Sequence, residues 1–359
     1  MSALGTPQAG KVTISDLAFR LGISKASVSY ALNGQPGVSE STRARVLALA
    51  SELGWYPSSS ARALSHSRTD SVGIVLFRDP EQIGAEPFYM SILAGIEGIL
   101  GTHEMNLLLR MVDPRTVPDE RTRDLPVYER WAGEGRVDGV ILFDHVHDDP
   151  RPPLLDRFKM PYVRLGAGLD ALPSAGNSNV TVSQAADAAT VVEALHRHGH
   201  RRIAFVSGPL DLLHEERKSE QITAHARRLG MSVVLCPADY SADDGGTATI
   251  AVMAGLVPGS PEFPTAVVYG NDLMAVGGLQ ALKRLNLCVP AQVSVISWDD
   301  SILCKLSSPS LSALSRSVSD LGRSSAQLLV ELIGGHEPRN IQACPGVFQL
   351  RESLGRNLF

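Results

Sequence analysis

The stretch that decides the fold reads Thr13-Ile-Ser-Asp-Leu-Ala-Phe-Arg-Leu21, then Gly22-Ile-Ser24, then Lys25-Ala-Ser-Val-Ser-Tyr-Ala-Leu-Asn33. Thr13 is a candidate N-cap with Asp16 three residues on, and Ser24 is a candidate cap for the second segment. Apolar residues recur at three- and four-residue spacing in both segments, so each is predicted to be a helix with one buried face. Gly22 predicts a tight turn between the two helices.

The second predicted helix has a small, hydrogen-bonding outer face. This face carries Lys25, Ala26, Ser29, Tyr30 and Asn33. Such a weakly cationic surface is one that the major groove of DNA accepts. The alternative is a plain three-helix bundle on the protein surface.

Two further helices are predicted in this N-terminal region. Ser39 caps a helix from Glu40 to Leu53, where an acidic first turn suits the helix dipole. Ala61-Arg-Ala-Leu64 also favours a helix, but so short a segment is marginal alone in water and would fold only against another surface.

Length and composition set the class of protein. A chain of 359 residues is too long for one compact core, and 44% hydrophobic with 20% charged residues is typical of a globular protein. No apolar run is long enough to span a membrane, and the first residues do not resemble a signal peptide, so we expect a cytoplasmic protein. The four cysteines are far apart, which favours neither a zinc site nor a disulfide framework.

The charge of the chain is unevenly distributed. Residues 1–69 hold seven Lys and Arg against three acids, or +4, which leaves −9 for the remainder of a chain whose net charge is −5. A basic head on an acidic body indicates that only the head meets a polyanion.

From Ser71 onward, short apolar runs alternate with helical segments. Two successive series of this kind predict two doubly wound α/β lobes, with a ligand in the cleft at the carboxyl ends of their strands. The predicted strands are 71–77, 106–111, 137–143, 162–165, 202–207, 232–236, 266–269 and 294–297. The predicted helices are 88–100, 125–132, 183–197, 215–228 and 273–284.

A colinear set of short motifs carries a family resemblance. The set includes Thr13-Ile-Ser-Asp-Leu-Ala, Gly22-Ile-Ser, Leu53-Gly-Trp-Tyr-Pro, Ala61-Arg-Ala-Leu, Gly199-His-Arg-Arg-Ile-Ala-Phe-Val, Asn271-Asp-Leu-Met-Ala and Val293-Ser-Val-Ile-Ser-Trp-Asp-Asp. Together they resemble the LacI/GalR family of bacterial transcriptional repressors, from about Lys11 to Arg351.

The resemblance implies an N-terminal all-α helix-turn-helix head and an α/β core like the periplasmic binding proteins. The head is expected over 11–57, a hinge helix with its linker over 58–69, and the core over 70–352. Within the core, the N-terminal lobe is expected over about 70–168 and 300–332, and the C-terminal lobe over about 169–299 and 333–352.

The resemblance also implies a DNA-binding set. Lys25, Ala26 and Tyr30 match positions that read base edges in the major groove. Tyr30 lacks the bidentate fork that arginine offers to guanine, so the base preference of relatives with arginine there is not carried over. The residues matching phosphate-contacting positions are Thr13, Ser24, Ser27 and Asn33. Ala61 and Leu64 match the hinge face that enters the minor groove, with Leu64 as the wedge. Pairing of two hinges implies a homodimer on a near-palindromic operator.

An effector site is implied in the cleft between the lobes. The residues matching its positions are Phe88, Tyr89, Lys218, Asn271, Asp299 and Arg316. Lys218 replaces, in register, an arginine that commonly clamps a sugar, and Arg217 stands beside it. Carboxylate and amide groups opposite an aromatic ring suit a sugar or another polyol. The alternative is that half of these residues only cap helices and loops.

Three other signals do not predict a separate site. Gly166-Ala-Gly-Leu-Asp-Ala171 matches a dinucleotide fingerprint, but Pro173 stands where the phosphate-binding helix should run, and we expect the crossover between the lobes there. The composition of Asp144-His-Val-His-Asp-Asp149 is metal-like, yet a solvated polar loop is expected. His196, His198 and His200 mark a helix end. No motif offers an activated nucleophile, so neither an enzyme nor a cofactor is predicted.

The sequence therefore predicts a ligand-responsive, DNA-binding transcriptional repressor that acts as a dimer at the nucleoid. The alternative is a sugar-binding module without specific DNA activity.

Overall fold

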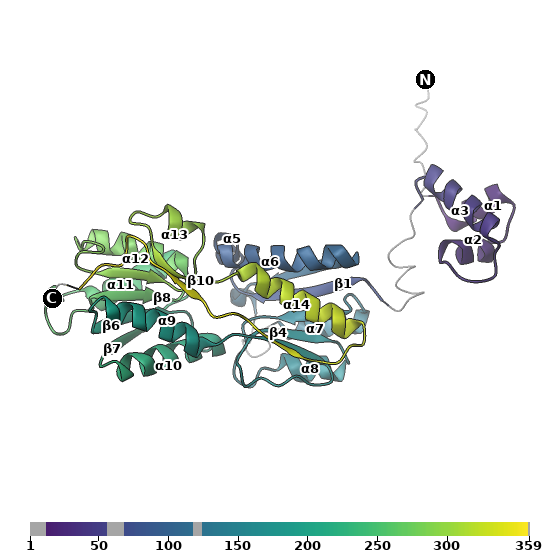
Figure 1. Cartoon of the computed structure of the whole chain (residues 1–359). Helices are drawn as coiled ribbons and strands as arrows, with labels where there is room; N and C mark the ends of the chain where they lie inside the picture. Colours follow the sequence, from purple (N-terminus) through teal and green to yellow (C-terminus); the bar gives the residue numbers. More distant parts are fainter. Residues whose placement is uncertain (1–11, 56–67, 118–123, 358–359) are drawn as a thin grey trace, which may run out of the picture. The chain divides into compact units, whose positions relative to one another are not determined.

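A computed structural model describes residues 12–55, 68–117 and 124–357 of the chain (Figure 1). The chain divides into two compact units, Met1–Thr69 and Asp70–Phe359. Within the described residues, no helix is long and apolar enough to cross a membrane.

The described part of the first unit is helical. It contains α1 (Ile14–Leu21), α2 (Lys25–Leu32) and α3 (Glu40–Glu52). Thr13 and Asp16 form a capping box, in which the Thr13 backbone N–H donates to Asp16 Oδ2 at 2.8 Å. Leu17, Val28 and Val46 come one from each helix and are fully buried together. The predicted helix-turn-helix and third helix are confirmed, whereas the predicted hinge segment with Ala61 and Leu64 lies outside the described residues.

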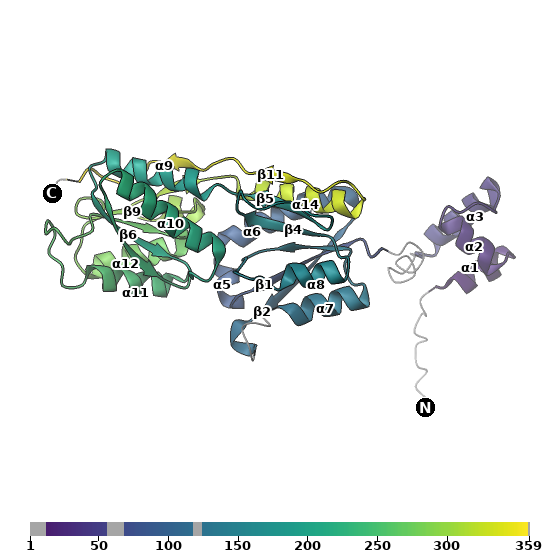
Figure 2. The same ribbon diagram turned by 90° about the horizontal axis from the view of Figure 1, so that it is seen from below.

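The second unit begins with a parallel sheet of six strands in the order β11-β5-β4-β3-β1-β2. Its strands are β1 (Ser71–Phe77), β2 (Asn106–Val112), β3 (Gly139–Leu142), β4 (Tyr162–Ala167), β5 (Asn177–Thr181) and β11 (Asn340–Gln342). Its helices are α5 (Pro80–Ala85), α6 (Pro87–Leu100), α7 (Leu125–Glu134), α8 (Arg151–Arg157) and α14 (Val318–Ile333). Helices α6 and α14 share one apolar core with the sheet, while α7 and α8 share another, so the sheet is covered on both faces (Figure 2).

The other lobe of this unit repeats the architecture. Its sheet runs in the order β12-β10-β9-β8-β6-β7, parallel except for β12, which is antiparallel to β10. Its strands are β6 (Arg202–Ser207), β7 (Ser232–Pro237), β8 (Ala266–Tyr269), β9 (Ser294–Ser297), β10 (Ser312–Ser315) and β12 (Val347–Gln349). Its helices are α9 (Gln184–Arg197), α10 (Leu213–Arg228), α11 (Ala242–Met253), α12 (Asp272–Arg284) and α13 (Ile302–Leu306). The predicted fold class is confirmed.

The sheet topology corrects three details of the expected lobe limits. Strands β5 and β11 were expected in the C-terminal lobe but belong to the first sheet. Strand β10 was expected in the N-terminal lobe but belongs to the second sheet. The reason is that β5 pairs directly with β4, Tyr162 opposite Asn177, through a connection without a helix. A pattern of alternating strands and helices gives no sign of such a connection.

The same pairing corrects the expectation for Gly166-Ala-Gly-Leu-Asp-Ala171. This segment joins β4 to β5 within the first lobe, so it is not the crossover between lobes. The chain first crosses after β5, where Ser183 caps α9 of the second lobe.

Candidate functional site

The outer face of α2 is available in the described head. Ser24, Lys25, Ala26 and Tyr30 are exposed, and the exposed fraction of Tyr30 is 43%. The Ser24 hydroxyl accepts the Ser27 backbone N–H at 3.0 Å and so caps α2 as predicted. Lys25, Ala26 and Tyr30 therefore share an accessible surface, and their contact with DNA stays a prediction.

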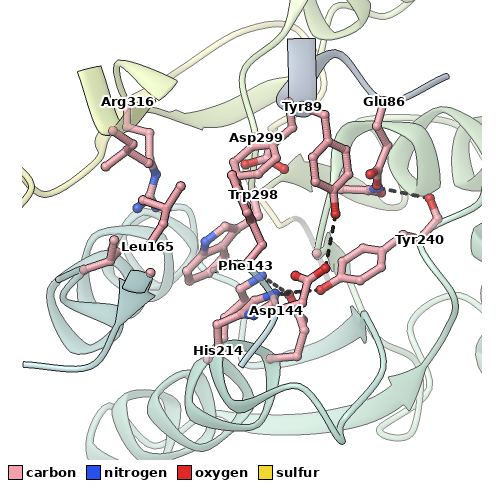
Figure 3. Close-up of a pocket in the computed structure, with 18 of the residues that line it drawn as sticks. Glu86, Tyr89, Phe143, Asp144, Leu165, His214, Tyr240, Trp298, Asp299 and Arg316 are labelled. Atoms are coloured by element: carbon pink, nitrogen blue, oxygen red, sulfur yellow. Dashed lines mark hydrogen bonds and ion pairs between the residues drawn. The ribbon is translucent and has the colours of Figure 1, made fainter. Parts of the chain in front are cut away.

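A cavity of about 130 Å³ lies between the two lobes, at the carboxyl ends of their strands (Figure 3). All six residues expected at the effector site line it: Phe88, Tyr89, Lys218, Asn271, Asp299 and Arg316. Tertiary structure thus brings together side chains that are up to 228 positions apart in the sequence. That they bind a ligand is a prediction that geometry alone does not test.

Asn271 connects the two lobes at this cavity. Its Oδ1 accepts the Met274 backbone N–H at 2.9 Å and caps α12. Its Nδ2 donates to Glu86 Oε1 at 2.7 Å and to the Tyr240 carbonyl oxygen at 3.0 Å. Glu86 stands at the start of α6 in the first lobe, so the buried amide both orders a helix start and joins the lobes.

Each of the three cations at the cavity is paired with an acid. Arg78 Nε donates to Asp144 Oδ2 at 2.9 Å, and its guanidinium lies over the Tyr240 ring at 4.4 Å from the ring centroid. The buried Lys218 ammonium pairs with the Glu215 carboxylate. These ion pairs leave little positive charge for a ligand.

Arg316 makes the third pair. Its Nη2 donates at 2.8 Å to Asp187, which is fully buried and also accepts the Gly346 backbone N–H at 2.8 Å. Three other acids that line the cavity, Glu86, Asp272 and Asp299, have no such cationic partner among the described residues. The inter-lobe cavity is therefore rich in acceptors and suits a ligand that donates hydrogen bonds.

Burial raises the pKa of Glu86 and that of Asp299. Desolvation raises the pKa of Glu86 to about 7 against the opposing effect of Arg78. Desolvation, with the neighbouring Asp272 charge, raises the pKa of Asp299 to about 7. Both groups therefore titrate near neutral pH.

We expect Glu86→Gln to stabilise the protein more at pH 8 than at pH 5. A carboxyl group whose pKa is raised in the folded state holds its proton while the unfolded chain has lost it, so stability falls as pH rises from the unfolded value, 4.5, to about 7. Glutamine is neutral throughout and can still accept from Asn271. Urea unfolding should show the difference between variant and wild type growing by on the order of 2 kcal/mol between the two pH values.

Glu337→Gln is the control for this experiment, because that side chain is exposed. The difference in the free energy of unfolding between Glu337→Gln and the wild type should be the same at both pH values. Parallel stability curves for Glu86→Gln and wild type would contradict the raised pKa of Glu86.

Several residues of the cavity were not predicted from the sequence. Besides Glu86 and Asp187, they include Arg78, Asp144, His214, Glu215, Tyr240 and Trp298. Trp298 directly precedes the predicted Asp299, and its ring faces Lys218 Nζ at 5.1 Å from the centroid. Asp144 follows β3, where strand ends of this fold place functional groups.

The segment Asp144–Asp149 is the solvated loop that we expected only at His147 and Asp148, which are exposed, whereas its other polar residues are buried or half-buried. His145 is 4% exposed, and its Nε2 lies 3.1 Å from the Leu165 carbonyl oxygen. Asp149 accepts from Arg151 Nη2 at 2.7 Å, and Arg151 is 1% exposed. The buried polar residues of the segment thus contact other groups of the fold. Within the described residues, no group of three or more His, Cys, Asp or Glu side chains could hold a metal ion.

The histidines at the end of α9 also have structural contacts. His198 is the C-cap residue of α9. His200 is buried, with Nδ1 2.8 Å from Thr265 Oγ1 and Nε2 3.2 Å from the Gly355 carbonyl oxygen. These contacts are those of a helix end docked against the second lobe, as expected.

Two family models match the chain. "Bacterial regulatory proteins, lacI family" matches residues 13–58, and "Periplasmic binding protein-like domain" matches residues 192–354. The HTH-type transcriptional regulator CelR of Thermobifida fusca is 31% identical over 326 residues, which cover 90% of this chain and 92% of CelR.

Solved structures resemble the whole chain. The complex of the transcriptional regulator CelR with cellobiose has a TM-score of 0.67 at 28% identity, covering 95% of this chain and 99% of that one. The lac repressor dimer bound to operator and the anti-inducer ONPF has a TM-score of 0.79 at 24% identity, covering 95% and 98%. The latter likeness shows the fold.

Proposed function

Because the chain belongs to the LacI family of bacterial transcriptional regulators, we propose that it is a repressor that binds a near-palindromic operator as a homodimer and responds to a sugar or sugar derivative. Its relatives include transcriptional regulators such as CelR and the ribose operon repressor, which favours a DNA-binding regulator over an enzyme, and the proposed partner DNA implies action at the nucleoid.

The observation that carries the proposal is the inter-lobe cavity. Six residues chosen by sequence match alone line one cavity between the two lobes. A regulator of this fold needs such a space, because a ligand there can favour one arrangement of the lobes over another. The exposed face of α2 supplies the DNA-binding surface that the proposal requires.

We assign base reading to Lys25, Ala26 and Tyr30, which lie on the exposed face of α2. Thr13, Ser24, Ser27 and Asn33 would contact phosphates and fix the position of the helix in the major groove. Ala61 and Leu64 would enter the minor groove from the hinge.

We assign effector binding to the six predicted residues of the inter-lobe cavity. Aromatic side chains such as Phe88 and Trp298 can cover the apolar face of a sugar ring, while the unpaired Asp299 carboxylate accepts from its hydroxyls. Lys218 would act mainly through its ion pair with Glu215 rather than as a free clamp.

Direct contacts between the lobes supply the proposed switch. Glu86 with Asn271 and Arg78 with Tyr240 each join residues of different lobes across the cavity. A ligand that fits among them changes the free energy of lobe closure, and through it the geometry of a dimer on DNA. Whether the ligand releases or recruits the protein follows from which arrangement it prefers.

The experiment that tests the proposal is selection from a pool of random DNA duplexes at physiological salt, followed by sequencing of the retained molecules. The proposal expects one near-palindrome with a flexible central step. Salt-sensitive retention with no preferred sequence would contradict it and favour a sugar-binding module with a basic head.

We expect Tyr30→Ala to relax the selected sequence at one position in each half-site. Removing one base-reading side chain should cost about 1–3 kcal/mol of discrimination at that position and leave non-specific binding unchanged. Leu47→Ala, at an exposed apolar residue of α3, is the control and should recover the wild-type sequence. An unchanged preference in Tyr30→Ala would remove Tyr30 from the reading face.

A further inference from the structure

A second cavity, of about 380 Å³, lies beside the first. The two share four lining residues, Gly166, Val182, Gln184 and His214. The second cavity is bounded by the connection from β4 to β5 and by the first turns of α10. Its other lining residues include Ala167, Gly168, Asp170 and Ala171 of the glycine-containing segment, together with His145, and none of these lines the first cavity.

The charge of the second cavity is opposite to that of the first. Two guanidinium groups, those of Arg164 and Arg217, line it together with one carboxylate, that of Asp170. Asp170 pairs with Arg217, because Arg217 Nη1 donates to its Oδ1 at 2.9 Å and Arg217 Nη2 donates to its Oδ2 at 3.1 Å. The two guanidinium groups therefore outnumber the carboxylate by one.

Arg164 forms no hydrogen bond or ion pair with its side chain in the part of the chain that the structure describes, although its charge is close enough to help lower the pKa of Asp170. Its Nε is buried and donates no hydrogen bond there. A buried guanidinium N–H without an acceptor is costly unless a ligand supplies one. Arginine also offers a planar fork that matches the oxygens of phosphate and carboxylate groups.

The histidines of this cavity do not change the balance of charge. Burial lowers the pKa of His145 to about 4, and burial also lowers that of His214. Both rings are therefore neutral at pH 7, where they can donate or accept one hydrogen bond without adding charge. One net positive charge remains.

Gly168 lies directly against the ion pair between Arg217 and Asp170. A Cβ at Gly168 would lie 1.4 Å from Arg217 Nη1 and 2.4 Å from Asp170 Oδ1. A side chain at this position would therefore have to displace the Arg217 guanidinium from the place where it pairs with Asp170.

We propose that this second cavity binds an oxyanion, a phosphate or carboxylate group, through the Arg164 guanidinium. The site is distinct from the acceptor-rich first cavity, whose cations are all paired with acids. The oxyanion can come from a free anion or from a charged group on a ligand that extends from the first cavity past Gly166.

The test uses the full chain and inorganic phosphate as the probe, at pH 7.5 and constant ionic strength. The ³¹P line width of phosphate should show saturable binding to the wild type. Arg164→Gln should weaken this binding at least tenfold. Arg228→Gln removes the same charge from an exposed residue near the end of α10 and should bind phosphate as the wild type does.

A second variant tests the balance of charge without altering Arg164. Arg217→Gln retains Arg164 but releases Asp170, whose carboxylate can then cancel the surplus charge, so phosphate binding should again weaken. No saturable binding to the wild type, or wild-type binding by Arg164→Gln, would overturn the proposal. Neither result involves operator DNA or a sugar response, so it is separate from failure of the proposed function.

Competition distinguishes the two sources of the oxyanion. One outcome is that glucose 6-phosphate displaces inorganic phosphate at a tenfold lower concentration than phosphate itself does, while glucose displaces none. This outcome would assign the oxyanion to a charged group on a sugar ligand. Displacement by both phosphates at equal concentration would assign the site to a free anion.

Discussion

Gly95→Ala should lower the free energy of unfolding of the lobed unit by about 3 kcal/mol, because it forces apart two closely packed helices. A Cβ at Gly95 of α6 would lie 2.0 Å from the Ser319 carbonyl oxygen of α14. The contact is reciprocal, since a Cβ at Gly322 of α14 would lie 2.2 Å from the Ile92 carbonyl oxygen of α6. Backbone carbonyl groups cannot rotate away as side chains do.

Displacement of α14 in Gly95→Ala should also affect the candidate effector site. Helix α14 carries Leu321, which lines the first cavity, and follows closely after Arg316. Moving α14 outward also loosens the packing of Ile92 and Ile96, both fully buried. We therefore expect weaker ligand response together with the lost stability.

Gly98→Ala in the same helix is the matched control. The Cβ there would meet only Arg323 Nη1, at 3.2 Å, and that atom ends a flexible side chain. Alanine is a better helix former than glycine, so stability should stay within about 1 kcal/mol of wild type or rise. Urea unfolding measures both variants, and equal effects at positions 95 and 98 would contradict the close helix contact.

Glu215→Leu should be the other strongly destabilising change, by about 3–5 kcal/mol. Glu215 is fully buried and pairs with Lys218, which is 4% exposed. Its Oε2 also accepts the Gly208 backbone N–H at 2.9 Å. Leucine leaves an ammonium group buried with no carboxylate in contact, and an uncompensated buried charge is more costly than the loss of one hydrogen bond.

A double-mutant cycle tests whether the unpaired charge of Lys218 causes the loss of stability. Lys218→Met alone should also destabilise, because it leaves the Glu215 carboxylate unpaired. The double variant, Glu215→Leu with Lys218→Met, removes both charges and should recover much of the stability that each single variant loses. Additive losses would contradict the ion pair, and a loss below about 1 kcal/mol in Glu215→Leu would show that Lys218 finds another acid, such as Asp299.

The sequence alone determined the elements of this protein and their class. Capping residues, glycines after helices and apolar periodicity are local signals, and they predicted α1, α2 and most strands of both lobes. Strands β6, β8 and β9 begin and end at the predicted residues. Motif order then predicted the family, which the similarity to CelR shows.

The sequence also placed six residues at one cavity, but not the groups that set its chemistry. Motif matches pointed to Lys218 and Asn271 as ligand contacts. The structure shows that Lys218 is paired with Glu215 and that Asn271 caps α12 and joins Glu86. Glu86 lies in the other lobe, where no local pattern connects it to Asn271, whereas Glu215 and Lys218 are three residues apart on one helix.

Only the tertiary structure decided which strands share a sheet and which charges remain unpaired. Strand β5 joins β4 through a connection without helical periodicity, so its lobe could not be inferred from the order of elements. The surplus charge at Arg164 likewise exists only because Arg217 occupies Asp170, 47 positions away. Local conformation follows from neighbours in the sequence, whereas pairing and electrostatic balance depend on distances that folding alone sets.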